Sequence, residues 1–257
     1  MLVGAMIDPY DSLLDQAGIE IALGFSRKLF DVFDSNWSMS QSQSSPSSPE
    51  EKLFFTYFYV LRKNIPFLEH PGFWQTLKAL HIIQTISILQ RKDASNKFGL
   101  SLSLDELQRI STIKGGLNSI LYLSLIDDSY REVITELPEN SQLSQMSLGT
   151  LKENFLSEQR LYQDRSKLTA AFYKEGALIQ LIDDYGDAVD DRNEGVLTAM
   201  NTNLQQLTFL KNFRSYLKKL EDDLYYSDIN SGVAKKIISC VELFLFWKIA
   251  KRFKQLV

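Results

Sequence analysis

Five aspartates are concentrated in one short stretch of the sequence, residues 176–198, whose other residues are compatible with a helix. They are Asp183, Asp184, Asp187, Asp190 and Asp191. An α-helix repeats every ~3.6 residues, so Asp183, Asp187 and one of the last two aspartates share a single face. Carboxylates stacked in this way repel each other, and Mg²⁺, which prefers oxygen ligands, would neutralise them. The spacing therefore predicts a magnesium site, and the alternative is an acidic helix face exposed to solvent.

Residues around these aspartates follow a wider pattern of type and spacing. The pattern consists of Gln180, Leu181, Ile182, Asp183, Asp184, Asp187, Asp191, Gly195 and Thr198. It resembles the second metal-binding helix of the class I isoprenoid synthases, a family that includes trans-prenyltransferases and terpene cyclases. A second resemblance lies upstream, where Lys114 precedes Gly115 and Gly116 in the sequence TIKGG followed by LNSILYL. This segment is similar to the Lys-Gly-Gly helix of the smaller bacterial members.

The resemblance implies an all-α fold, a single-domain helical bundle over 1–257 that encloses a central apolar cavity. It implies Mg²⁺ as the cofactor and a prenyl diphosphate as the substrate. The implied metal ligands on the acidic helix are Asp183, Asp184, Asp187 and Asp191, and the implied substrate-binding residues are Lys114, Gln180 and Arg192. Asp183 and Asp187 would be catalytic, while Asp184 would lie in the outer shell or be turned away.

A second acidic cluster lies at the start of the chain, in the segment IDPYDSLLD. Asp8, Asp11 and Asp15 are three and four residues apart and share one face of a helix predicted over 10–34. Class I synthases carry two acidic clusters on facing helices, so the resemblance implies that these three also bind Mg²⁺, with Asp11 among the catalytic residues. In the alternative, Asp8 caps the helix and the other two complement its positive N-terminal dipole.

The glycine pair Gly115–Gly116 lies inside the helix predicted after a capping box formed by Ser103 and Glu106. Each glycine inside a helix costs roughly 1 kcal/mol relative to alanine. We therefore expect the backbone here to approach another helix or a ligand closely. Lys114 beside the pair either reaches a diphosphate oxygen as a point charge or faces solvent next to tightly packed helices.

Apolar residues recur at helical spacing along most of the chain. Helices are predicted at 10–34, 52–64, 73–90, 103 to about 134, 148–162, 166–191, 204–226 and 233–256. The run LFFTYFYVL within 52–64 suits a buried strand or a buried helix, and the absence of turn signals and alternation around it favours a helix. Residues 35–50 are serine-rich with two prolines and are predicted to be a flexible loop, or a lid.

Composition excludes several other classes of function. A net charge of −4 gives no electrostatic reason to expect nucleic acid as a partner. One cysteine cannot form an internal disulfide, and two histidines are too few for a histidine-rich zinc site. No run reaches the ~18–20 apolar residues of a membrane span, so we expect no stable membrane insertion. The N-terminus lacks the basic region of a secretory signal, which favours a cytoplasmic location.

Three functions are compatible with these features. The first is a class I terpene synthase, a lyase that ionises a prenyl diphosphate and then cyclises the product or eliminates a proton. The second is a chain-elongating prenyltransferase, but we find no Arg-Arg pair of the kind usual downstream of that family's first acidic cluster. The third is a non-catalytic helical protein that binds a lipid or another protein and has a degenerate first metal site. Class I synthases are often homodimers, so the resemblance also allows a homodimer.

Overall fold

The computed structural model describes residues 9–10, 12–33, 48–66, 69–126, 137–156, 166–227 and 229–255. Within these ranges the chain is all-α, as predicted, and its only β-type pairing is an isolated bridge between Arg91 and Val196. The acidic residues Asp8 and Asp11 lie outside the described residues, and so does most of the serine-rich segment.

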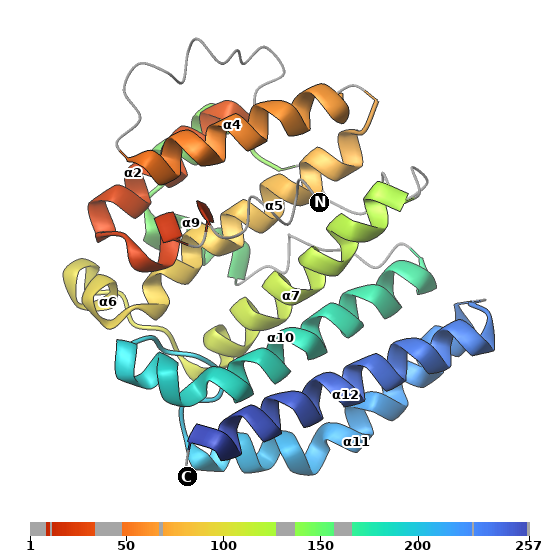
Figure 1. The fold of residues 1–257 in the computed structure, drawn as a ribbon. Coiled ribbons are helices and arrows are strands. Elements are labelled where there is room, and N and C mark those ends of the chain that lie inside the picture. Colours follow the sequence, from red (N-terminus) through yellow and green to blue (C-terminus); the bar gives the residue numbers. More distant parts are fainter. Residues whose placement is uncertain are drawn as a thin grey trace.

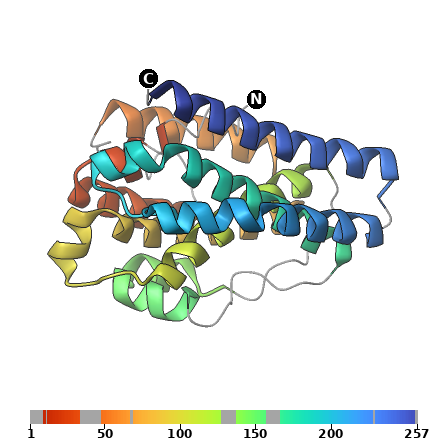
Figure 2. The same cartoon turned by 90° about the horizontal axis from the view of Figure 1, so that it is seen from below.

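The described helices follow one another in the order shown in Figure 1. They are the π-helical turn η1 (Ser12–Gln16), α2 (Ile19–Val32), α4 (Pro49–Asn64), α5 (Pro71–Ser87), the 3-10 turn η2 (Ile88–Gln90), α6 (Lys92–Phe98), α7 (Leu104–Ile126), α8 (Asn140–Gln145), α9 (Leu148–Leu156), α10 (Lys167–Glu194), α11 (Asn203–Tyr226) and α12 (Ser231–Gln255). The long helices α5, α7, α10 and α12 succeed one another across the bundle, and α11 lies beside α12 on the far side of α10 (Figures 1 and 2).

Helix α10 carries the acidic stretch, and both of its ends are set by local sequence. The Ser166 side chain caps its N-terminus by accepting a hydrogen bond from the Thr169 amide at 3.1 Å. Gly195 ends the helix with a φ of 78°, in the left-handed region that glycine adopts without strain. Helix α7 packs against one side of α10, and α11 and α12 pack against the other. Of the acidic residues in this part of α10, Asp184 is thus buried, the other four aspartates are partly buried, and Glu194 is exposed.

Three glycines allow α7 and α10 to approach each other closely. A Cβ atom added to Gly115 would overlap the backbone carbonyl of Gly176, and one added to Gly176 would overlap the carbonyl of Gly115. A Cβ atom on Gly116 would overlap the ring of Tyr173. The predicted close approach at the glycine pair is therefore to another helix. It brings the neighbouring Lys114 to the acidic part of α10.

The described core consists of two clusters on opposite sides of the α7–α10 pair. The first is rich in aromatic residues from α2, α4 and α5, among them Phe25, Phe58 and Trp74. The second lies between α10, α11 and α12 and includes Phe213 and Val241. None of the described helices is both long enough and apolar enough to cross a membrane.

Several predicted helices are confirmed, including the ambiguous run within 52–64, which is part of α4. The capping box is present: the Glu106 carboxylate accepts from the Ser103 amide at 2.8 Å, and the Ser103 hydroxyl accepts from the Glu106 amide at 3.2 Å. The predicted continuous helix over 10–34 is wrong. The π-helical turn ends at Gln16, and Gly18 takes an extended backbone conformation, φ −57° and ψ 147°, before α2 begins.

The predicted loop over 35–50 is wrong at its C-terminal end. Ser48 caps α4, and its hydroxyl accepts from the Glu51 amide at 3.2 Å. Pro49 occupies the first helical position, where its missing amide hydrogen is no disadvantage. The remainder of the loop, 35–47, lies outside the described residues.

Candidate functional site

An acidic pocket of about 330 Å³ lies between α7, α10 and the η2 turn. Most residues of the sequence pattern line it, namely Gln180, Asp183, Asp184, Asp187, Asp191 and Thr198, together with Lys114 of α7. The aspartates come together because they share the inner side of one helix. Lys114 joins them because the glycine crossing places its helix directly alongside.

Asp184 is the most buried of these aspartates and faces α7. Its carboxylate accepts a 2.5 Å hydrogen bond from the Ser111 hydroxyl and a 3.1 Å bond from the Gln180 amide. Burial raises the pKa of Asp184, and these hydrogen bonds and the charge of Lys114 offset part of that rise. Asp184 therefore fastens α10 to α7. Gln180, predicted to contact substrate, also supports Asp184.

Asp183 and Asp187 lie one turn apart and share a cation that the sequence interpretation missed, Lys248 of α12. The Lys248 ammonium lies 2.5 Å from a carboxylate oxygen of Asp183 and 2.7 Å from one of Asp187. Lys251 adds a second ammonium 3.0 Å from Asp187. Burial alone would raise the pKa of Asp187, but the hydrogen bonds from the two lysines outweigh it and lower the pKa.

The sequence contains a pattern that indicates a buried position for Lys248. Lys248 follows Val241 and Leu245 at spacings of seven and three residues, which is the apolar stripe of an amphipathic helix. Val241 and Leu245 are both buried in the second core cluster. A lysine at a core position requires a buried counter-charge. The helix containing Asp183 has the largest group of aspartates in the sequence, which made it a candidate partner for this lysine.

Asp191 lies one turn beyond Asp187 and differs from it in its electrostatic environment. Burial, followed by the charges of Asp184, Asp187, Glu194 and Asp183, raises its pKa from an ordinary value near 3.8 to about 7. Repulsion among carboxylates is thus concentrated at this residue. A divalent cation bound next to Asp191 would relieve that repulsion.

Asp191→Asn is expected to stabilise the metal-free protein at pH 8 and to have much less effect at pH 5. Below pH 4 the aspartate is protonated in both the folded and the unfolded chain. As the pH rises to about 7 only the folded state still holds the proton, so the folded state loses stability relative to the unfolded one until both are ionised. The gain above pH 7 should be about 1–2 kcal/mol after allowance for solvent screening. Thermal unfolding in chelator at both pH values checks this, and Asp222→Asn on exposed α11 is the control; an equal gain at pH 5 would contradict it.

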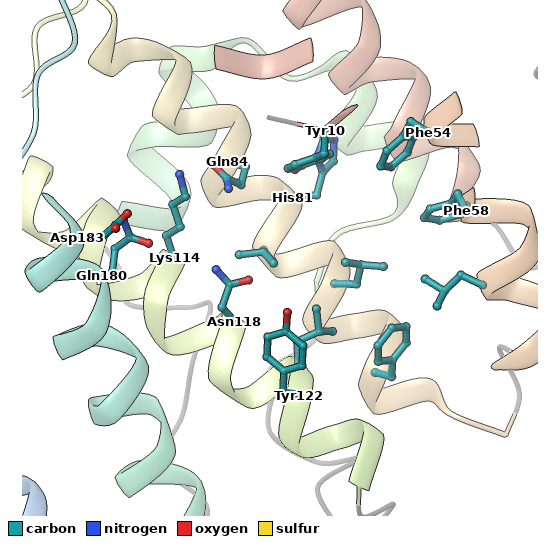
Figure 3. Close-up of a pocket in the computed structure, with 15 residues that line it drawn as sticks. Tyr10, Phe54, Phe58, His81, Gln84, Lys114, Asn118, Tyr122, Gln180 and Asp183 are labelled. Atoms are coloured by element: carbon teal, nitrogen blue, oxygen red, sulfur yellow. The ribbon is translucent and has the colours of Figure 1, made fainter. Parts of the chain in front are cut away.

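A second pocket of about 230 Å³ adjoins the acidic one and is mainly apolar. Aromatic residues of α4 and α5 line its far part, among them Phe54, Phe58 and Phe73. Figure 3 shows Lys114, Gln180 and Asp183 at one end of this pocket and Phe54 and Phe58 at the other. Lys114, Gln180 and Asp183 line both pockets. The acidic and apolar pockets therefore meet at these three side chains.

Two further residues shape the electrostatics of the apolar pocket. Among the described residues, Lys114 forms no ion pair or hydrogen bond, so its ammonium group is available at the junction of the pockets. His81 lies deeper, and its Nδ1 accepts from the Tyr10 hydroxyl at 2.8 Å while Nε2 lies 3.0 Å from the Ser26 carbonyl. Burial lowers the pKa of His81 to about 4, and the imidazole is neutral at physiological pH. The polar end of the apolar pocket thus carries a free positive charge, whereas His81 adds none.

Among the remaining predicted site residues, the structure describes the side chain of Arg192 alone. Arg192 is exposed and lines neither pocket. Asp8 and Asp11 lie outside the described residues, and of Asp15 only the backbone, in η1, is described. The first acidic cluster therefore stays a prediction.

The donor types in the acidic pocket fit Mg²⁺. Asp183, Asp187 and Asp191 supply carboxylate oxygens from successive turns of one helix, and burial together with the neighbouring carboxylates raises the pKa of Asp191. In their present positions, no three acidic, histidine or cysteine side chains among the described residues are grouped closely enough to hold one metal ion. Lys248 holds two of the three candidate ligands. Binding of Mg²⁺ would therefore require this lysine to move.

Comparisons with known proteins returned no match: no family model, no curated protein and no solved structure matches this chain.

Proposed function

We propose that this protein is a class I terpene synthase, which ionises a prenyl diphosphate in a magnesium-dependent reaction and then cyclises the product or eliminates a proton. One observation carries the proposal: the acidic pocket and the apolar pocket meet at Lys114, Gln180 and Asp183. A substrate with an anionic head and a hydrocarbon tail suits such a two-part site. The head would lie with the aspartates and their metal ions, and the tail would extend among the aromatic rings.

Residues of the acidic pocket would have separate roles in the ionisation of the substrate. Asp183, Asp187 and Asp191 would hold Mg²⁺, which when bound withdraws charge from the diphosphate as a Lewis acid. Lys114 would add a point charge at the leaving group, since no described residue neutralises it. The hydrogen bond between Asp184 and Ser111 would hold α10 against α7, and with it the metal ligands next to Lys114.

The apolar pocket would stabilise and shield the cation that remains once diphosphate leaves. The carbon–oxygen bond breaks, its electron pair leaves with the diphosphate, and the allylic carbon becomes positively charged. Phe54, Phe58 and Tyr122 line the pocket, and the face of an aromatic ring can attract such a cation. Burial among these side chains also excludes water, which would otherwise trap the cation as an alcohol.

Release of inorganic diphosphate from geranyl, farnesyl and geranylgeranyl diphosphate tests the proposal. We expect release with Mg²⁺, none with chelator, and a loss of about 100-fold or more in Asp183→Asn, because the variant removes one charge from the metal ligands. Asp222→Asn, on the exposed face of α11, should behave like the wild type. No release from any of the three substrates by the folded protein would refute the proposal. A product longer than the substrate, formed when a second diphosphate substrate is supplied, would instead identify a chain-elongating prenyltransferase.

A second candidate function is favoured by Lys248. Because this lysine already neutralises Asp183 and Asp187, the same two pockets could bind an amphiphile without any metal. The protein would then be a non-catalytic binder of a lipid with an anionic head. Binding of a prenyl diphosphate that is equally tight in Mg²⁺ and in chelator, without release of diphosphate, would select this function.

A further inference from the structure

Lys248 occupies the place between two carboxylates where a metal ion would be expected. We propose that Lys248 is a built-in cation of this site: its ammonium group and a divalent cation compete for Asp183 and Asp187, so that metal binding releases the C-terminal part of α12. The inference rests on the proposed function in one respect, since it takes the aspartate stripe as a divalent-cation site. It adds to the proposed function a consequence for α12, namely that metal binding releases the C-terminal part of this helix.

The contacts of Lys248 are those of a bound ion rather than of a surface ion pair. The residue is only 3% exposed, although most lysines lie at the surface. Its ammonium group bridges Asp183 at 2.5 Å and Asp187 at 2.7 Å. Two carboxylates thus face one ammonium group, as they would face a bound cation.

Residues of both α10 and α12 lie close to the Lys248 side chain. Gly186 lies between the two aspartates in sequence, and a Cβ atom there would overlap the aliphatic stem of Lys248. On the other side the ammonium lies 5.4 Å from the centre of the Trp247 ring and 5.7 Å from that of Phe244. A glycine on one helix and two aromatic rings on the other thus hold the stem and the head of one side chain.

Charge makes the lysine and a divalent cation alternatives. Asp183 and Asp187 together carry two negative charges, and Lys248 and Lys251 already balance them. Two cations a few ångströms apart in a partly buried site repel each other, so both would not share the same carboxylates. A buried ion pair is also a weak source of stability compared with apolar packing. A role in ligand exchange therefore explains the buried lysine better than a purely stabilising role.

Release of Lys248 would act on the end of α12. Beyond Lys248, this part of the helix is held by Lys251 on Asp187 at 3.0 Å and by Arg252, whose guanidinium donates to the Gln206 side chain at 2.6 Å. The first of these contacts is to Asp187, a carboxylate that the metal would also bind. Metal binding would therefore remove the contacts of Lys248 and Lys251, and of the described cations that fasten this end of α12 it would leave Arg252.

Binding of Mn²⁺, followed by electron paramagnetic resonance without substrate, tests the competition. Lys248→Met, which keeps the length of the stem but removes the charge, should bind Mn²⁺ about tenfold more tightly than the wild type. Gly186→Ala keeps the lysine but places a methyl group where its aliphatic stem lies. This variant should therefore also bind Mn²⁺ more tightly than the wild type. Lys235→Met, at an exposed position of the same helix, is the matched control and should leave the affinity unchanged.

Hydrogen exchange of α12 gives an independent readout. We expect Mn²⁺ to speed exchange at 245–255 in the wild type and to have little effect on this segment in Lys248→Met, where the contact is already absent. If Lys248→Met does not fold, Gly186→Ala carries the test. The proposal is overturned if the folded variants bind Mn²⁺ no more tightly than the wild type, or if exchange of α12 is insensitive to the ion. Neither result depends on diphosphate release, so failure of this inference is distinct from failure of the proposed function.

Discussion

Gly176→Ala is expected to lower the free energy of unfolding by about 2–3 kcal/mol, although alanine is the better helix former. The added methyl group would overlap the Gly115 carbonyl and the Ser119 side chain, so α7 and α10 would have to move apart. Backbone atoms cannot relax as a flexible side chain can, which makes this substitution more costly than most additions of one methyl group. Because the crossing also sets the position of Lys114, diphosphate release should fall with stability.

Urea denaturation measures this effect, and Gly24→Ala on α2 is the matched control. A Cβ atom at Gly24 would meet nothing within 4 Å, so that variant should be neutral or more stable by up to roughly 1 kcal/mol. The two variants make the same chemical change inside a helix and differ only in what lies opposite. Equal stability of Gly176→Ala and the wild type would show that α7 and α10 do not cross at these glycines.

Lys114→Met should reduce kcat/KM for diphosphate release by about 100-fold, the effect of losing one well-placed charge at a developing anion. Lys114 lines both pockets, and no described residue pairs with it, so its charge is free to act on the ligand. Lys114→Arg keeps the charge and should restore part of the activity. Lys211→Met, on the exposed face of α11, is the control. Wild-type kinetics in a folded Lys114→Met would assign this lysine to packing alone.

Helical periodicity predicted the acidic part of the site because its residues share one helix. Asp183, Asp187 and Asp191 recur at four-residue spacing, and any regular helix brings them to one side. Periodicity did not predict the place of Asp184, which the family resemblance alone assigned to the outer shell or turned away from the metal. Its partner Ser111 was not predicted, because that contact depends on how two helices cross.

Helical periodicity could not predict contacts between helices that are far apart in the sequence. Lys248 lies 61 residues from Asp187, and its pairing depends on the packing of α12 against α10. The apolar pocket likewise combines residues of α4, α5 and α7, whose order in the bundle follows from tertiary packing. The glycine pair predicted a close approach but not its partner, which proved to be Gly176.

The central claim is that the acidic and apolar pockets form one site for a single amphiphilic substrate. The most direct measurement compares the affinities, in Mg²⁺, of inorganic diphosphate and of an unreactive farnesyl thiolodiphosphate. The hydrocarbon chain should strengthen binding by about 100-fold, which the burial of roughly 110 Å² of apolar surface provides. Asn118 lies between Lys114 and Tyr122 along the pocket (Figure 3), so Asn118→Phe should remove most of that gain and leave the affinity for inorganic diphosphate unchanged. Equal affinities for the two ligands in the wild type, or an undiminished gain in Asn118→Phe, would contradict the account.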